Sequence, residues 1–475
     1  METFLAKLNE VVVSIDSFLA DYVLLILLVG CGIYFTIRTR FVQVRCFGEG
    51  WRRFFGELSL NGEKAGKSGM SSFQALATAI AAQVGTGNIV GACGAIIIGG
   101  PGAIFWMWVI AFLGMATIYA EAVLAQKTRT TDASGEVAGG PAYYIRTAFR
   151  GRFGKALAVF FSVAIVFALG FMGAMVQSNS ISGAMQNAFG IAPWVSGIIL
   201  ALITGLIFIG GTRRIASFTE KIVPIMAVVY ILGSLILLGC RVREIPATFG
   251  LIFSCAFAPQ AAFGGAFGTL IAKAVTQGAK RGLFSNEAGM GSTPHAHAVA
   301  KVKEPHEQGV VAMIGVFIDT FIILTMTALV VISTMYAGKD LRAIGLDGLY
   351  AGQSATMAQS AFSSVFGSGI GNAFVAICLL FFAFSTIIGW NYFGRLNITA
   401  LFGNTRPVNL AYSITAVGCV FLGTVFYSDL VWNLQDVFDL LMVLPNAVAL
   451  IALGGMVAEE ARRARRAKVT AELPS

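Results

Sequence analysis

The sequence predicts an all-α protein that crosses a membrane many times, and composition is the first observation that predicts it. Hydrophobic residues occupy 57% of the 475 positions, charged residues only 12%, and the mean hydropathy is +0.79. A soluble domain needs roughly 25% charged residues to cover its surface. Because this chain has about half of that share, much of its surface must face something other than water.

The second observation is the number of long apolar segments. A transmembrane helix needs about 20 mostly apolar residues. The chain has eleven such segments, at residues 19–37, 72–98, 103–126, 157–189, 194–210, 217–239, 247–272, 309–335, 369–390, 408–426 and 431–457. The residues before the first segment hold three acidic residues and one Lys, unlike the basic start of a cleaved signal peptide, so we expect this segment to remain as a helix.

The third observation is the distribution of positive charge. Alternate connections on one side of the predicted helices hold 28 of the 33 Lys and Arg residues. Cytoplasmic loops of membrane proteins are enriched in these residues. We therefore expect a cell-membrane protein (bacterial inner membrane) in a lipid bilayer, with the amino terminus outside and the tail in the cytoplasm. The net charge of +9 follows from this topology, so no nucleic-acid partner is predicted.

Two of the predicted helices contain runs of Gly, Pro and polar residues, at 83–91 and 258–268. Gly costs about 1 kcal/mol in a helix interior and Pro about 3 kcal/mol, so we expect both helices to unwind there. Close helix packing is the alternative for any single Gly pair. The two breaks, however, begin two sets of five helices, 2–6 and 7–11, and the odd number inverts the second set.

Breaks at matching positions of two inverted halves indicate a transporter with its binding site at the breaks. We divide the chain into four parts accordingly. These are a peripheral helix with a basic cytoplasmic loop (1–71), a first five-helix repeat (72–239), a second inverted repeat (240–457) and a basic cytoplasmic tail (458–475).

Three stretches carry a family resemblance: Gly99–Trp108 (GGPGAIFWMW) running on to Gly114, the break Gly85–Asn88, and Gly282–Gly289, which we place in the cytoplasm. They resemble the alanine or glycine:cation symporter family, the sodium:alanine symporters. The resemblance covers essentially the whole chain. It implies a leucine-transporter-type core formed by helices 2–11, with helix 1 peripheral, and sodium-driven uptake of small neutral amino acids such as alanine or glycine.

The same resemblance implies a sodium site. The carbonyl oxygens of Ala81 and Val84 in the first break would bind the ion, and the hydroxyls of Ser385 and Thr386 would complete the site. All four are neutral oxygens, which suit a hard cation. In the alternative interpretation, the two hydroxyls only bond to the carbonyl four residues earlier in their own helix.

We expect the substrate at the two breaks, because helix N-termini attract a carboxylate and freed carbonyls accept hydrogen bonds from an ammonium group. The expected substrate-binding residues are Gln83, Gly85, Thr86, Gly87, Asn88, Gln177, Gly264, Gly265, Phe267 and Trp390. Gln177 could instead bond to another helix, since a buried amide must be hydrogen-bonded. Trp390 could instead anchor its helix at the cytoplasmic interface.

Two carboxylates lie in or near the apolar segments, where such groups are functional candidates. Glu121 lies near the cytoplasmic end of its helix and could simply pair with Lys or Arg. Asp319 lies deeper and could relay a proton. Proton coupling is therefore the alternative to sodium coupling.

No enzyme, channel or further cofactor is predicted. The seven cysteines form no CxxC pair, and His295 and His297 are only half of a structural metal-ligand set. The sequence has no HExxH, GxSxG or P-loop motif. A channel would usually need a filter ring and an oligomer, whereas one chain with two inverted halves favours a transporter.

Overall fold

The computed structural model describes residues 2–57, 71–131, 137–209, 211–257, 267–339, 354–426 and 428–472. In these ranges the chain is almost wholly helical, with one antiparallel pair of short strands, β1 (Thr130–Thr131) and β2 (Val137–Ala138). The elements before residue 210 are α1 (Glu2–Phe18), η1 (Leu19–Leu24), α2 (Leu25–Arg38), α3 (Val42–Arg45), α4 (Phe47–Glu57), α5 (Ser72–Gln83), η2 (Gly87–Gly91), α6 (Ala92–Gly99), α7 (Gly102–Thr128), α8 (Pro141–Ala148), α9 (Gly151–Ile165), η3 (Val166–Gly173), α10 (Ala174–Phe189) and α11 (Pro193–Ile209). Those after it are α12 (Gly211–Cys240), η4 (Val242–Glu244), α13 (Ile245–Phe257), α15 (Phe267–Asn286), α16 (Pro294–Val299), α17 (Pro305–Val316), η5 (Phe317–Leu324), α18 (Thr325–Met335), α20 (Ser354–Phe366), α21 (Ser368–Phe402), α22 (Arg406–Val425), α23 (Ser428–Ala452) and α24 (Gly454–Glu472).

Among the described residues, eight helical segments are long and apolar enough to cross a membrane, and a bent pair, Phe73–Gln83 with Gly87–Gly99, makes a ninth if it counts as one span. The chain is therefore a multi-pass, all-α membrane protein, as predicted. The total of eleven helices stays a prediction. The helix α11 is apolar but only 17 residues long, and residues 258–266 of the predicted seventh span lie outside the described residues.

The first predicted break is confirmed. The helix α5 begins with a capping box, in which the Ser71 hydroxyl accepts a hydrogen bond from the Gln74 backbone N–H. It ends at Gln83, because Val84 leaves the helical region with φ −80° and ψ 89°. The helix resumes at Gly87, and the two halves are bent by 43°.

The predicted second break, at 258–268, lies mostly outside the described residues, because residues 258–266 are not described. It stays a prediction. The helix α15, which begins at Phe267, continues to Asn286, beyond the predicted end of the span at 272. The described chain then leaves the helix at residues 287–293, where Glu287, Gly289 and Gly291 have positive φ angles of 57°, 92° and 85°. We call this segment, 287–293, the second break of the described structure.

Buried ion pairs explain how α15 can continue past residue 272. Hydropathy favours ending a span before Lys280 and Arg281, since charges are costly in a membrane. In the structure, Lys280 Nζ lies 2.6 Å from a carboxylate oxygen of Asp16 and 2.7 Å from one of Asp436. Both nitrogens of the Arg281 fork bond to Asp436 at 3.2 Å. Because partners from α1 and α23 neutralise these charges, α15 runs through the protein interior.

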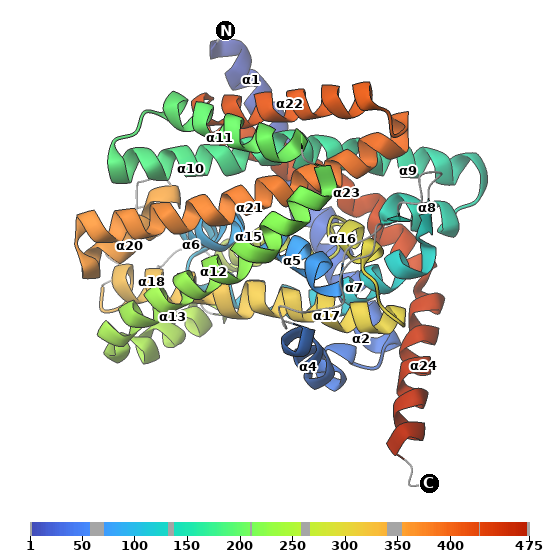
Figure 1. The fold of residues 1–475 in the computed structure, drawn as a ribbon. Coiled ribbons are helices and arrows are strands. Elements are labelled where there is room, and N and C mark those ends of the chain that lie inside the picture. Colours follow the sequence, from blue (N-terminus) through green and yellow to red (C-terminus); the bar gives the residue numbers. More distant parts are fainter. Residues whose placement is uncertain are drawn as a thin grey trace.

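Several of the long helices lie side by side. In Figure 1, α10, α21 and α22 run nearly parallel, α20 and α13 lie at the left of the molecule, and α8 lies at the right. The segment α1–η1–α2 packs on the outside against α7 and α23, and side chains such as Tyr22 and Ile26 are exposed. This arrangement agrees with the prediction of a peripheral first helix.

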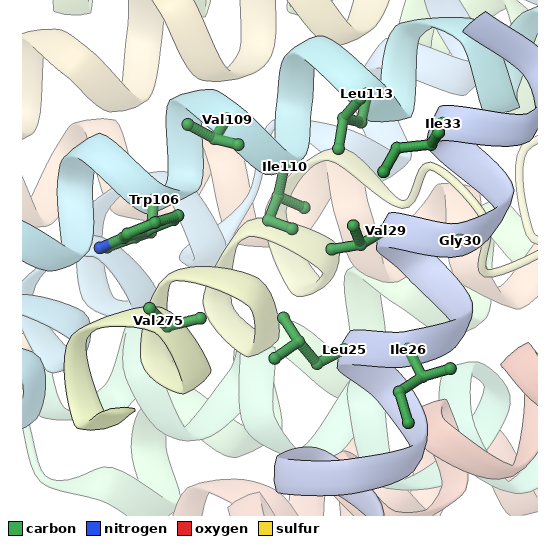
Figure 2. Close-up of a pocket in the computed structure, with 10 residues that line it drawn as sticks. All are labelled: Leu25, Ile26, Val29, Gly30, Ile33, Trp106, Val109, Ile110, Leu113 and Val275. Carbon is green, nitrogen blue, oxygen red and sulfur yellow. The ribbon is translucent and has the colours of Figure 1, made fainter. Parts of the chain in front are cut away.

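An apolar groove separates this peripheral helix from the core. Figure 2 shows side chains of α2, α7 and α15 around a groove of about 510 Å³. All ten lining residues are apolar or glycine, and they include Gly30, Trp106 and Val275. Such a lining suits contact with lipid hydrocarbon rather than with a charged solute.

Gly102, in the GGPG stretch, lies where α7 starts against the end of α13. A Cβ atom there would lie 2.5 Å from the Ala256 backbone nitrogen, so we expect Gly102→Ala to destabilise the protein by about 1–3 kcal/mol. Thermal unfolding in detergent measures this change. Gly183→Ala is the matched control, because a Cβ there meets nothing within 4 Å. Equal unfolding temperatures of the two variants would contradict the prediction.

Candidate functional site

The two interrupted helices meet in the middle of the molecule. The Gln83 side-chain amide donates to the backbone carbonyl of Asn286 at 2.8 Å, which joins the end of α5 to the end of α15. Gly87 makes this contact possible, because a Cβ there would lie 2.8 Å from the Ser285 Cα. The two segments of non-helical backbone are therefore held against each other.

Five neutral oxygens converge where α5 ends against α21. The Thr386 hydroxyl lies 2.9 Å from the Ala81 carbonyl oxygen and 3.4 Å from that of Val84. The Ser385 hydroxyl lies 3.5 Å from the Ala81 oxygen. The Phe382 carbonyl is the fifth oxygen, at 2.9 Å from the Ser385 hydroxyl and 3.0 Å from that of Thr386. The structure thus brings together Ala81, Val84, Ser385 and Thr386.

This cluster has more acceptors than protons. Two hydroxyls supply two protons, while three carbonyls and the hydroxyl oxygens all have lone pairs directed into the same space. The hydroxyls do contact the Phe382 carbonyl of their own helix, as the back-bonding alternative expected. Back-bonding leaves the carbonyls of Ala81 and Val84 without a full set of donors, so the cluster has the ligand type that a small cation can use. The Phe382 carbonyl was not predicted as part of it, because a backbone oxygen leaves no trace in residue type.

Two polar atoms beside the first break have no hydrogen-bond partner among the described residues. They are the Thr86 hydroxyl oxygen and the Gln177 amide nitrogen. The Gln177 carbonyl oxygen accepts from the Thr86 backbone N–H at 3.1 Å, so α10 is fixed to the break. Since buried polar groups are normally bonded, these two atoms are the best-placed groups for a polar ligand.

Gln83 and Asn88 are engaged with the protein instead. Gln83 bonds to Asn286, as described above. The Asn88 carbonyl oxygen accepts from the Gly85 N–H at 2.9 Å, and its amide nitrogen donates to a carboxylate oxygen of Asp319 at 2.6 Å. These side chains hold the broken backbone in place, and Gly85 and Gly87 let the neighbouring elements approach it.

Asp319 lies fully buried beside the first break. Its second carboxylate oxygen accepts from the hydroxyls of Ser285 and Thr320, both at 2.9 Å. All of its hydrogen-bond donors in the described structure are neutral. A buried carboxyl group without a cationic partner can take up a proton or a cation, so Asp319 is a second candidate for ion coupling.

Trp390 is enclosed by protein. Its side chain is 1% exposed, its ring N–H donates to Glu287 at 2.5 Å, and its ring packs edge-on against Phe284. A Cβ at Gly173 would collide with the indole. An interfacial anchor would keep its N–H at headgroup level, so the enclosed position does not fit that alternative. Trp390 forms a wall next to the second break.

Two buried carboxylates lie around the second break. Glu121 accepts from the Gly289 N–H at 3.1 Å and from the Asn446 amide at 2.6 Å, so in the described structure it does not pair with Lys or Arg. Glu287 accepts from Ser292 as well as from Trp390. It belongs to the Gly282–Gly289 stretch, which is buried in the protein, and the cytoplasmic position of this stretch stays a prediction. Sequence reasoning gave Glu287 no role, and the Gly and polar residues next to it were the available signal.

Part of the predicted substrate site cannot be compared with the structure. Gly264 and Gly265 lie outside the described residues. Phe267 is the first residue of α15, and nothing further is described for it. Their roles stay predictions.

Comparison with known proteins agrees with this geometry. Residues 5–474 match the sodium:alanine symporter family. The chain is 42% identical to the sodium/alanine symporter AgcS of Methanococcus maripaludis, over 94% of this chain and 95% of that protein. It is also 42% identical to the putative sodium/proton-dependent alanine carrier protein YrbD of Bacillus subtilis, over 95% of this chain and 90% of the relative.

Among solved structures, MhsT in complex with L-phenylalanine matches with a TM-score of 0.54 and 16% identity, over 83% of this chain and 89% of that chain. A likeness at this identity shows the fold, which is the leucine-transporter type. The predicted fold class is therefore confirmed.

Gly85 gives a test of the site geometry. A Cβ there would collide with the Thr386 hydroxyl and lie 3.3 Å from the Gln177 carbonyl oxygen. We expect Gly85→Ala to lower amino-acid uptake into proteoliposomes at least about tenfold, since a shift of this size at a binding centre costs about 1.4 kcal/mol or more. Gly91→Ala in the same broken helix is the control, because its Cβ would meet atoms only at 3.8 Å or more. Equal activity of the two variants would argue against this location.

Proposed function

Because the chain belongs to the sodium:alanine symporter family, we propose that it imports small neutral amino acids, alanine and glycine, together with sodium by alternating access. Family membership makes the protein an amino-acid and cation symporter and not an enzyme. The identity of the amino acid and of the coupling ion belongs to the proposal. So does its place in a bacterial cell membrane, with the amino terminus outside.

The cluster of five oxygens is the observation that carries the sodium assignment. Each of its five oxygens is neutral, whereas a divalent hard cation such as Ca²⁺ is usually held by carboxylates. The cluster joins two elements, the unwound end of α5 at Ala81 and Val84 and the middle of α21 at Ser385 and Thr386. A bound sodium ion would tie these elements together, and its release would let them separate, which couples ion binding to the position of the broken helix.

The amino acid is proposed to bind beside this cluster. The N-terminus of η2 at Gly87, which continues into α6, offers backbone N–H groups and a positive helix dipole to a carboxylate. The unpartnered Thr86 hydroxyl and Gln177 amide add two more groups. Trp390, packed on Gly173 and Phe284, restricts the space for a side chain to a small group.

Proton coupling is the second candidate, and Asp319 is the observation that favours it. Its carboxyl group is buried between the two breaks and is held only by neutral donors in the described structure. A proton bound there would be released when the surroundings open to water. The two mechanisms place the coupling ion on different residues, so variants can separate them.

Alanine uptake should require an inward sodium gradient. Proteoliposomes containing the full-length protein would be loaded with potassium buffer and diluted into sodium or choline buffer, each with and without an imposed pH gradient. We expect labelled alanine to accumulate in sodium with or without the pH gradient. Accumulation in choline that follows the pH gradient, and is lost in Asp319→Asn, would replace sodium by a proton.

Thr386→Ala should weaken activation by sodium more than it weakens substrate binding at saturating sodium. The variant removes one of five oxygens, and water replaces a lost ligand poorly in a buried cluster. We expect the sodium concentration for half-maximal uptake to rise about tenfold, a difference of roughly 1.4 kcal/mol. Thr415→Ala is the matched control, because its hydroxyl only bonds to the carbonyl of Ala411 in the exposed part of α22. Unchanged sodium activation in Thr386→Ala would show that the hydroxyl is structural.

A further inference from the structure

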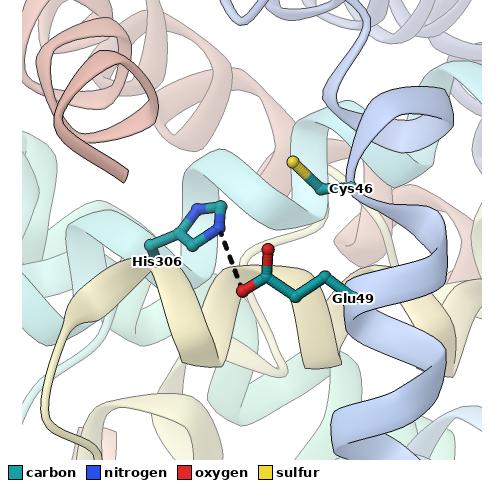
Figure 3. A group of neighbouring side chains, drawn as sticks. All are labelled: Cys46, Glu49 and His306. Carbon is teal, nitrogen blue, oxygen red and sulfur yellow. Dashed lines mark ion pairs between the residues drawn. The ribbon is translucent and has the colours of Figure 1, made fainter. Parts of the chain in front are cut away.

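Three side chains with metal-binding atoms meet in a mostly buried position where α4 packs on α17. Cys46 and Glu49 come from the segment after the first helix, and His306 comes from the start of α17. The thiol sulfur, a carboxylate oxygen and an imidazole nitrogen all lie within 4.8 Å of one another. Figure 3 shows the imidazole and the carboxylate facing each other, with the thiol on the same side of its chain segment.

The fold holds these groups together closely. Cys46 immediately precedes α4, and Glu49 lies in its first turn. The Gly50 N–H donates to the Cys46 carbonyl, so the backbone is already helical at Cys46, and the spacing of three puts both side chains on one face. Gly50 lets α4 lie flat on α17, because a Cβ there would be 2.6 Å from the Val310 carbonyl oxygen. Phe47 packs edge-on against Phe317, with ring centroids 4.8 Å apart.

A hydrogen bond to the ring nitrogen that faces away from Glu49 sets the orientation of His306. Its Nδ1 lies 2.8 Å from the Tyr119 hydroxyl, so its Nε2 points toward Glu49, 3.6 Å from the nearer oxygen. A histidine that binds a metal usually bonds through its other nitrogen to such a partner, which sets the ring orientation. The hydroxyl of Tyr119 is therefore placed as a support for a ligand.

The carboxylate of Glu49 has one oxygen that is not used by the neighbouring cationic side chains. One oxygen, Oε1, faces both His306 and the Arg53 side chain, with Arg53 Nε at 3.1 Å. Arg53 also pairs with Glu307 at 3.2 Å, so it keeps a partner if Glu49 turns toward a metal.

We propose that Cys46, Glu49 and His306 form a binding site for a divalent metal of the zinc class. Sulfur, nitrogen and oxygen ligands in one set suit Zn²⁺, whereas Mg²⁺ and Ca²⁺ prefer oxygen alone. Three protein ligands leave a fourth tetrahedral position for water. On binding, the thiol gives up its proton and His306 binds through a deprotonated Nε2, so affinity increases with pH. The metal would fasten α4 to α17.

The other two histidines do not compete for this role. The ring nitrogens of His295 lie 2.7 Å from the Ser292 carbonyl oxygen and 2.9 Å from the Asn397 amide. His297 is 1% exposed, and its Nδ1 lies 2.8 Å from the Gln308 amide. The proposed metal site includes no residue of the breaks or of the five-oxygen cluster, so it does not depend on the proposed transport function.

Metal titration of the purified full-length protein tests the site. The protein in detergent would be treated with a chelator, desalted and titrated with CoCl₂ or ZnCl₂. We expect one Co²⁺ per chain with a thiolate-to-cobalt charge-transfer absorption, and a higher unfolding temperature with Zn²⁺. Cys46→Ser should lose the absorption, and His306→Ala should bind Zn²⁺ at least about a hundredfold more weakly. Tyr119→Phe, which keeps all three ligands, should bind about tenfold more weakly.

Cys240→Ser is the matched control, because Cys240 is an exposed cysteine outside the cluster, and this variant should behave like the wild type. Unfolding temperatures of the chelator-treated variants show whether Cys46→Ser still folds. If it does not, the cobalt spectrum of the wild type decides alone. A wild-type protein that binds no Co²⁺ through a thiolate, or a Cys46→Ser variant with wild-type Zn²⁺ affinity, would overturn the proposal and leave an ion pair between Glu49 and His306.

Discussion

The contact between the two interrupted helices is the constraint on which the remaining features depend. Backbone that leaves a helix inside a membrane protein loses its internal hydrogen bonds, and other protein groups must replace them. Gln83 does this across the interface by donating to the Asn286 carbonyl. Gln177 and Asn88 accept hydrogen bonds from the N–H groups of Thr86 and Gly85, respectively. The Thr86 hydroxyl and the Gln177 amide nitrogen, which keep no partner among the described residues, mark the space for a ligand.

Charge is divided unequally around this contact. On the α21 side all five oxygens are neutral carbonyl or hydroxyl groups that face one another. A monovalent cation bound among them would add a single positive charge. The buried carboxyls of Glu121 and Glu287 lie around the second break, and that of Asp319 lies beside the first. Each is held by neutral donors in the described structure. Glu287 also has a left-handed backbone, a conformation that costs of order 1–3 kcal/mol in a residue other than glycine. Backbone strain and buried carboxyl groups thus occur together in the segment next to Trp390.

Ion pairs between distant elements support this arrangement from one flank. Lys280 and Arg281 lie one turn before the end of α15 and would be too costly in hydrocarbon, but Asp16 and Asp436 neutralise them. The pairs tie α15 to α23 and to the peripheral α1. Because removing one partner of such a buried pair leaves an uncompensated charge, these residues fix the path of α15 and, with it, the position of the second break. The first helix is peripheral in space but bonded to the core.

The sequence by itself determined the features that follow from composition and local chemistry. Apolar length predicts the membrane helices, and the Gly-rich run at 83–91 predicts the first break, because both signals lie within a few adjacent residues. Ser385 and Thr386 were identifiable as hydroxyls in an apolar helix. Only the tertiary structure decided what depends on distant partners. Lys280 is buried because Asp16 and Asp436 reach it, so α15 continues past residue 272 and leaves the helix only at 287–293. Likewise, the Phe382 carbonyl joins the oxygen cluster, and His306 meets Cys46, because helix packing and not residue spacing brings these atoms together.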